Sequence, residues 1–211
     1  MYAPDPGDAR ERLELMDYKR RIFELYARVR GSEPEAGWQE WRAVRQRLFV
    51  THPQSPVAPE GRGPHNVPAY FPYDPSWRIQ APLVAAEPET YDIGASDGGT
   101  YSFTRIGTCD LGRDAALEVY WLDGYGGGLF VPFADADAGT ETYGGGRYLL
   151  DTVKGADLGV TDAGDLILDF NFAYQPSCSY DPRWSCPLAP PANRLALPVH
   201  AGERYAQEGP S

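Results

Sequence analysis

The chain has 211 residues, of which 42% are hydrophobic and 23% charged, and its formal net charge is −11. This length fits one domain with an appendage and is sufficient for a sizeable hydrophobic core. The acidic balance argues against nucleic acid and anionic membranes as partners, because binding to phosphate groups needs clustered Lys and Arg.

The sequence shows neither a membrane-spanning segment nor a secretory signal. No stretch approaches the roughly 18 apolar residues that cross a bilayer, and the first residues contain no basic region followed by an apolar run. We therefore expect a cytoplasmic protein with reduced cysteines. Only Lys19 and Lys154 of the 19 basic residues are lysines, which we interpret as a coding bias.

Residues 1–7 are predicted to be disordered, and residues 8–52 to form a helical hairpin. Asp8 with Glu11 has the pattern of a capping box, and Ser32 with Glu35 has the same pattern at the start of the second helix. We expect three residues of the second helix to pack on the rest of the protein: Trp38, Trp41 and Leu48. The exposed faces of the hairpin are predicted to carry a basic strip: Arg20, Arg21, Arg28, Arg42, Arg45 and Arg47.

Residues 53–75 contain seven prolines, so they cannot form a central strand or a helix and should wrap the domain as extended chain. Residues 76–205 are predicted to be a β-rich domain that ends in a loop rich in Pro and Cys. Between Ser76 and Phe172, apolar residues recur at every second position and turn signals separate the segments. The pattern predicts a mainly β fold with α, in which an antiparallel sheet is rolled into a barrel or small sandwich.

A glycine-rich run, Thr142–Tyr148, precedes one of the predicted strands. Its backbone N–H groups could cradle an anion, and the Arg147 guanidinium could supply a two-pronged donor to a carboxylate or phosphate. The run lacks the Lys-Ser/Thr pair of a phosphate-binding P-loop. In the alternative interpretation, Arg147 pairs with Asp169 or Glu141 inside the fold.

A second candidate segment begins at Asp169 and Asn171, which share one face of a predicted strand, and continues into an irregular loop. If that face points inward, the two polar groups form part of a site, because buried polar groups need partners. We predict one polar pocket formed by this segment and the glycine-rich run, lined by Tyr143, Gly145, Arg147, Tyr148, Asp169, Asn171, Tyr174, Cys178 and Asn193.

Cys178 and Cys186 leave several roles open. They could form a disulfide, although a reducing cytoplasm opposes it. Their spacing does not match a zinc knuckle, so no metal site and no cofactor are expected. Cys178 is the candidate catalytic residue, because a nearby base or cation could lower its pKa and make it a nucleophile. Quiet burial is the commonest state of a free cysteine.

Several short motifs together resemble one known family. They are Tyr70-Phe71-Pro72-Tyr73-Asp74, Leu129–Asp135 with Thr142–Tyr148, Asp169-Phe170-Asn171, Cys178, Cys186-Pro187, Pro190-Pro191, Asn193 and Ala201-Gly202-Glu203. The combination resembles the domain of unknown function 1684 family over about residues 10–205. The chain departs from the family pattern at Asp137, Gln175 and Ala192. The resemblance implies no established activity, so no catalytic residue is carried over.

Three functions therefore stay open. The first is binding of a small molecule, anionic if Arg147 is its partner, in one polar pocket. The second is a hydrolase or transferase that depends on Cys178. The third is a structural fold without a ligand site, in which Arg147, Asp169 and Asn171 saturate one another. A fully paired Arg147 with no cavity beside it would argue against binding at that position.

Overall fold

The computed structural model describes residues 8–205, so the disorder predicted for residues 1–7 lies outside the described residues. The chain begins with the predicted helical hairpin, made of α1 (Ala9–Arg30) and α2 (Pro34–Thr51). The Asp8 carboxylate accepts hydrogen bonds from two backbone N–H groups of the first turn of α1. The second predicted capping box does not form, because the Ser32 hydroxyl instead donates to the Arg28 carbonyl at the end of α1.

The hairpin packs on the rest of the protein through aromatic side chains of α2. Trp38, Trp41 and Leu48 are all buried, as predicted. The Trp41 ring lies 5.3 Å from the ring of Phe172, in the 3-10 turn η4 (Phe170–Phe172). It also lies 5.6 Å from the ring of Tyr70, in strand β1 (Ala69–Tyr70). Burial of such large rings supplies much of the stabilising free energy at a helix–sheet contact.

The predicted antiparallel sheet is present. Five strands pair in sequential order: β3 (Val84–Gly94), β4 (Thr100–Asp110), β5 (Ala116–Leu122), β6 (Gly128–Phe133) and β7 (Arg147–Asp151). Two smaller antiparallel pairs accompany it, β2 (Arg78–Ala81) with β8 (Leu166–Asp169), and β1 with β9 (Glu203–Arg204). β3 and β7 remain edge strands, so this sheet is not closed into a barrel.

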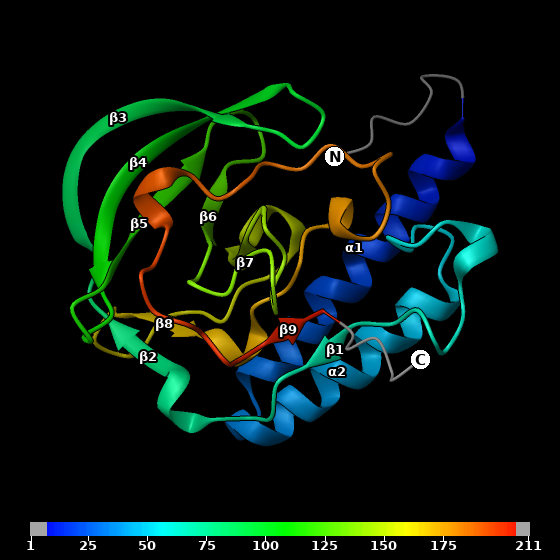
Figure 1. Cartoon of the computed structure of the whole chain (residues 1–211), viewed down its shortest axis with the longest axis horizontal. Helices are drawn as coiled ribbons and strands as arrows, with labels where there is room; N and C mark the ends of the chain where they lie inside the picture. The colour runs from blue at the N-terminus through cyan, green and yellow to red at the C-terminus, as the bar shows by residue number, and fades with distance from the viewer. Residues whose placement is uncertain (1–7, 206–211) are drawn as a thin grey trace.

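The five-stranded sheet is covered on both faces. Alternate residues of β5 belong to different hydrophobic clusters, with Val119 in the main core and Tyr120 in a smaller aromatic cluster with Phe103, Phe130 and Tyr148. This follows from the period of two, which sends successive side chains to opposite faces. Figure 1 shows the long β3–β4 hairpin at one side of the molecule and the two helices at the other.

Short 3-10 turns occur along the remaining chain. They are η1 (Pro59–Gly61), η2 (Pro75–Trp77), η3 (Thr152–Lys154), η5 (Ser177–Ser179) and η6 (Pro191–Asn193). The loop after β8 returns to the sheet, where Tyr174 and Tyr148 exchange two backbone hydrogen bonds of 2.8 and 3.0 Å. The C-terminal loop therefore lies against the outer edge of β7. Among the helices in residues 8–205, none is long and apolar enough to cross a lipid bilayer.

Candidate functional site

Arg147, the first residue of β7, is buried and its guanidinium binds the C-terminal segment. Nη1 donates to the carbonyls of Ala201 and Glu203, and Nη2 donates to that of Val199 at 2.9 Å. The guanidinium lies over the Phe133 ring, and Nη2 is 3.6 Å from the Asp135 carboxylate. Burial lowers the pKa of Arg147 to about 10, although Asp135 opposes this shift.

The partners predicted for a buried Arg147 were wrong. Asp169 and Glu141 were expected, but the carboxylate beside it is Asp135. The reason is strand register, since Arg147 faces Phe133 across the β6–β7 pair and Asp135 follows two residues later. A register set by pairing of two strands cannot be deduced from the local pattern of one strand.

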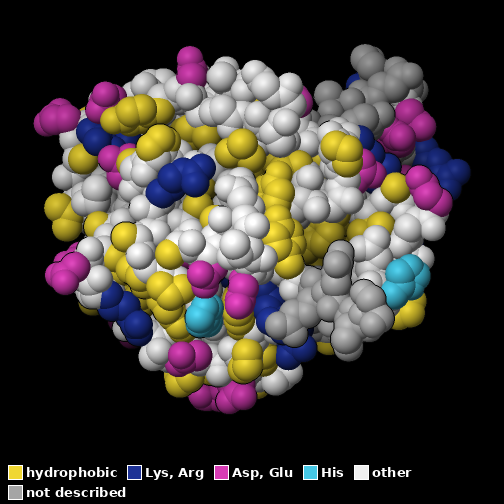
Figure 2. Space-filling model, viewed as in Figure 1, with side chains coloured by type: hydrophobic (Ala, Val, Ile, Leu, Met, Phe, Trp, Pro, Cys, Tyr) yellow, Lys and Arg dark blue, Asp and Glu magenta, His cyan; other side chains and the backbone are white. Residues whose placement is uncertain are grey.

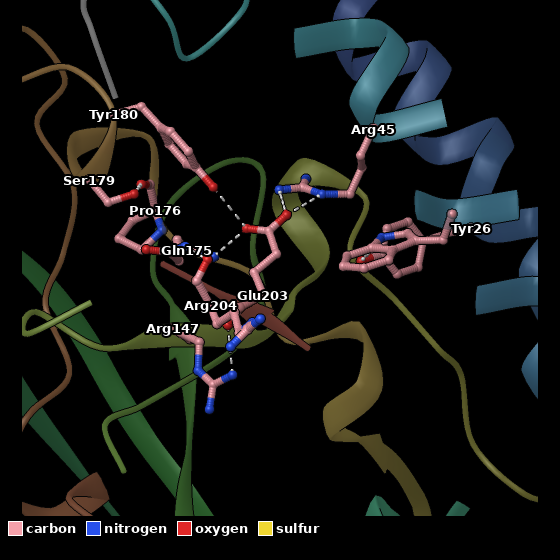
Figure 3. A network of polar contacts seen from close by, with 10 residues as sticks. Tyr26, Arg45, Arg147, Gln175, Pro176, Ser179, Tyr180, Glu203 and Arg204 are labelled. Atoms are coloured by element: carbon pink, nitrogen blue, oxygen red, sulfur yellow. Dashed lines mark hydrogen bonds and ion pairs between the residues drawn. The ribbon is translucent and has the colours of Figure 1, made fainter. Parts of the chain in front are cut away.

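A second arginine binds the same C-terminal segment from the helical side (Figure 3). Arg45 of α2 donates twice to Oε1 of Glu203, at 2.6 and 2.8 Å. The other oxygen, Oε2, accepts from the Gln175 backbone N–H at 2.8 Å and from the Tyr180 hydroxyl at 3.3 Å. Burial raises the pKa of Glu203 despite the attraction of Arg45.

The exposure predicted for Arg45 was therefore wrong, since only 7% of this residue is accessible to solvent. Its position explains the burial, because Arg45 follows Trp41 by four residues and precedes Phe49 by four. Residues four apart share one face of a helix, so Arg45 lies within the apolar face. Its guanidinium also lies 4.8 Å from the centre of the Tyr174 ring.

Two further predicted site residues, Asp169 and Asn171, form hydrogen bonds or ion pairs with other groups of the protein. The Asp169 carboxylate pairs with Arg78 at 2.9 Å and accepts from the side chain of Asn171. The Asn171 side chain also bonds both the N–H and the carbonyl of Asp74. Both residues point inward, but their partners belong to β2 and the turn before it. They hold two chain segments together.

Asn193 has a similar role beside β5 and β6. Its side-chain oxygen accepts from the Glu118 N–H at 2.8 Å, and its nitrogen donates to the carbonyls of Glu118 and Pro132 at 2.9 and 2.7 Å. The turn η6 is thereby attached to β5 and β6. Neither Asn193 nor Arg147, Asp169 or Asn171 lines the enclosed cavity of this protein.

The glycine-rich run packs closely against the protein's own chain. Gly146 has a φ of +93°, and a Cβ atom there would lie 2.5 Å from the Phe133 carbonyl oxygen. At Gly145 a Cβ atom would lie 2.5 Å from the Tyr143 ring, whereas at Gly144 it would meet nothing closer than 3.6 Å. Gly146 is thus required by its left-handed backbone and by close packing on the Phe133 main chain, whereas the space at Gly145 is limited by the Tyr143 and Leu188 side chains.

A partly enclosed cavity of about 100 Å³ lies between α1, the C-terminal half of α2 with the residues that follow it, the η3 turn and the C-terminal loop. Residues of α1 at helical spacing form one wall: Leu15, Tyr18, Lys19, Ile22 and Tyr26. The opposite walls include Tyr148 and Tyr174, which pair through their backbones, and three residues that follow one or the other in the sequence: Lys154, Gln175 and Cys186. Tyr148 and Tyr174 are thus the predicted site residues that the cavity brings together.

The charged residues that line this cavity are all basic. They are Lys19, Arg45 and Lys154, and no described lining residue is a carboxylate. Arg45 is paired with Glu203, and Lys154 with Asp151 at 3.1 Å. Burial opposes the charge on Lys154, but the attraction of Asp151 leaves its pKa above the ordinary value.

The two lysines were missed as site residues when their scarcity was interpreted as a coding bias. Both lysines of the chain line the cavity. Only the position of Lys19 gave an indication in the sequence. It lies on the apolar face of α1, three residues before Ile22 and seven before Tyr26. Lys154, 135 positions later, gave no local indication that it meets the same helix. Its position depends on long-range packing.

Two larger hollows, of about 470 and 350 Å³, are open grooves on the outer side of the helices. Their walls combine arginines with carboxylates such as Asp17 and Glu24. Figure 2 shows acidic and basic side chains intermingled over one face of the molecule. Exposed charges are screened by solvent and salt, so the enclosed cavity is the better candidate site.

Cys178 and Cys186 lie beside this cavity, and their thiols interact. Cys178, in η5, is within 3.6 Å of the Tyr143 hydroxyl, and Cys186 lines the cavity. The neighbouring Cys186 thiol, with smaller contributions from Ser96 and Tyr143, lowers the pKa of Cys178 to about 6, although burial opposes this shift. The same interaction raises the pKa of Cys186. The three cysteines are unbridged.

The recorded partners of Cys178 are a thiol and two hydroxyls, and neither a histidine nor a carboxylate is among them. His52 and His200 instead contact Asp17 and Asp137. A hydrolase or transferase mechanism usually needs a base within hydrogen-bond reach of the nucleophile. Within residues 8–205, no group of three or more His, Cys, Asp or Glu side chains is arranged to hold a metal ion.

The comparisons with known proteins agree with the motifs. A comparison with curated proteins gave no match. A solution NMR structure of an uncharacterized protein from gene locus rrnAC0354 of Haloarcula marismortui is 37% identical, with a TM-score of 0.59. The similarity covers 83% of this chain and 96% of that one. The family model described as "Protein of unknown function (DUF1684)" matches residues 66–204. This chain therefore belongs to the DUF1684 family.

Proposed function

We propose that this protein binds a small oxyanion, a carboxylate or phosphate group, in the enclosed cavity beside α1. The observation that carries the proposal is the charge of the lining. All three charged lining residues are cations, in a chain whose net charge is −11. Cations brought together without a lining carboxylate repel one another unless an anion joins them.

The uncompensated charge belongs to Lys19. Arg45 and Lys154 each have a carboxylate partner outside the lining, Glu203 and Asp151. No ion pair joins Lys19 to another described residue, and the neighbouring Tyr18 hydroxyl likewise has no hydrogen bond recorded in residues 8–205. An ammonium and a hydroxyl from adjacent positions of α1 are thus available as donors. Hydrogen bonds from a charged donor to an oxyanion are the strong kind.

The volume limits the ligand. The cavity has a volume of about 100 Å³. It is smaller than the roughly 300 Å³ of pockets that enclose drug-sized ligands. The proposed occupant is therefore a small carboxylate or inorganic phosphate, or the anionic end of a longer molecule. The surrounding tyrosine rings provide apolar contacts for a short carbon chain.

This proposal changes the location predicted from the sequence. The pocket contains Tyr148 and Tyr174, whereas the polar groups of Arg147 bind main-chain carbonyls of the last described residues. We infer a structural role for Arg147, Asp169, Asn171 and Asn193, supported by the recorded protein partners of each. The structural role of Arg147 also supports the cavity. The C-terminal segment that Arg147 binds includes Glu203, the carboxylate that pairs with the lining residue Arg45.

Isothermal titration calorimetry with phosphate and with acetate at constant ionic strength tests the proposal. We expect saturable binding of at least one anion, and about a tenfold or larger loss of affinity in Lys19→Met and in Lys154→Met, because a charge-assisted hydrogen bond contributes about 1.5–3 kcal/mol. Arg20→Met is the matched control, since Arg20 neighbours Lys19 but does not line the cavity.

Two outcomes would contradict the proposed anion binding. The proposal fails if neither anion binds at about 10 mM, a range in which weak sites begin to saturate. It also fails if an anion binds but both lysine variants keep the wild-type affinity. In that second case the anion occupies another surface, and the outer arginine groove becomes the place to test.

A further inference from the structure

We propose that Cys178 and Cys186 are a peroxide-reactive dithiol pair, in which Cys178 is oxidised first and Cys186 then closes a disulfide. The proposal does not depend on anion binding. Two neighbouring thiols, one half-buried and one buried, are the arrangement that such a reaction needs. The third cysteine, Cys109, is fully buried and separate from the pair.

The position of Cys186 is fixed by Ser96. The Cys186 N–H donates to the Ser96 hydroxyl oxygen at 3.1 Å, and its carbonyl accepts from the Ser96 N–H at 2.9 Å. The same hydroxyl donates to the Trp184 carbonyl. The backbone bridge between Ala95 and Pro187 continues this attachment. Ser96 therefore fixes the backbone of Cys186, whose thiol interacts with Cys178.

Cys178 is placed to be the first thiol oxidised. It is only partly buried in a short 3-10 turn, so a small oxidant can reach it. The Tyr143 hydroxyl, 3.6 Å from its sulfur, and the neighbouring Cys186 thiol can donate hydrogen bonds that stabilise the thiolate. The thiolate is the form that attacks peroxide. Cys186, buried and with a raised pKa, retains its proton.

The chemistry balances with hydrogen peroxide as the oxidant. The Cys178 thiolate attacks one peroxide oxygen, so an S–O bond forms, the O–O bond breaks and the released hydroxide takes up a proton to become water. The Cys186 sulfur then attacks the Cys178 sulfur and the S–O bond breaks. The leaving hydroxyl takes the Cys186 proton as water. Two thiols are oxidised by two electrons, and one peroxide is reduced to two waters.

Peptide mapping of the wild-type protein tests the proposal directly. Arg183 lies between the two cysteines, so trypsin separates them into different peptides unless a disulfide joins them. After brief exposure to hydrogen peroxide and alkylation of the remaining thiols, we expect a linked Cys178–Cys186 peptide pair that a reductant separates. Cys109 should be recovered in its alkylated form.

Two variants test the order of reaction. In Cys186→Ser, dimedone should trap Cys178 as the sulfenic acid. In Cys178→Ser, oxidation of Cys186 should be at least tenfold slower than oxidation of Cys178 in the wild type, and Cys109→Ser should behave as wild type. Near-UV circular dichroism verifies the folding of each variant. The proposal is overturned if the wild type yields no linked peptides, or if Cys186 reacts as fast without Cys178.

Discussion

Replacement of Arg147 by alanine should destabilise the fold severely. The guanidinium is 1% exposed and donates to three main-chain carbonyls of the C-terminal segment. Its loss leaves those carbonyls without their donor and leaves the buried Asp135 without its cation. The substitution also empties the volume that the guanidinium fills beside the Phe133 ring.

The expected magnitude follows from the burial. Removing one partner of a buried ion pair costs about 3–5 kcal/mol, because the other charge stays buried and unpaired. A typical domain is stable by about 5–15 kcal/mol, so Arg147→Ala should remove a large part of the free energy of unfolding. Arg147→Lys should lose less, because an ammonium keeps the charge but lacks the planar fork that reaches several carbonyls at once.

Urea unfolding followed by tryptophan fluorescence at neutral pH measures this loss. Arg20→Ala is the matched control, because the Arg20 side chain is 61% exposed and exposed substitutions usually change stability by less than about 0.5 kcal/mol. The structural role of Arg147 is refuted if Arg147→Ala has the same unfolding midpoint and slope as the wild type and the Arg20→Ala control.

Two further predictions concern the glycine-rich run and the cysteine pair. Gly146→Ala should destabilise by about 2 kcal/mol or more, since a left-handed non-glycine residue alone costs about 1–2 kcal/mol and the new Cβ would lie 2.5 Å from the Phe133 oxygen. Gly144→Ala, with open space around it, should be nearly neutral, and equal unfolding midpoints for the two variants would contradict the packing. Alkylation of Cys178 by iodoacetamide should accelerate as pH rises through about 6 and level off above it, because only the thiolate reacts. A rate that begins to rise only above pH 8 would show that the pKa is not lowered.

The elements of this fold were predictable because they depend on local periodicity. The spacing of Trp38, Trp41 and Leu48 indicated a helix with one buried face, and the alternation around Val119 indicated a strand in an antiparallel sheet. Both are confirmed. These patterns depend on contacts between close sequence neighbours and on the separation of polar from apolar residues.

The candidate site was harder to predict because its residues meet only through long-range packing. Arg45 and Glu203 are 158 positions apart, and no pattern around either one indicates the other. Lys19 and Lys154 likewise meet the same cavity from a helix and a turn. The polar residues that stood out, such as Asn171 and Asn193, were buried as expected for an inward face, but each has a protein partner.

Nuclear magnetic resonance titration with phosphate and with acetate tests the central claim, that the enclosed cavity binds a small oxyanion. In ¹H–¹⁵N spectra of uniformly labelled protein, we predict saturable shifts concentrated at the amides of Lys19, Ile22, Lys154, Ala156 and Gln175, whose residues line the cavity. In Lys19→Met, the shifts at the remaining amides should need about a tenfold or higher anion concentration, because a charge-assisted hydrogen bond contributes about 1.5–3 kcal/mol. Shifts confined to other surfaces, or no saturable shift at about 10 mM of either anion, would contradict the account.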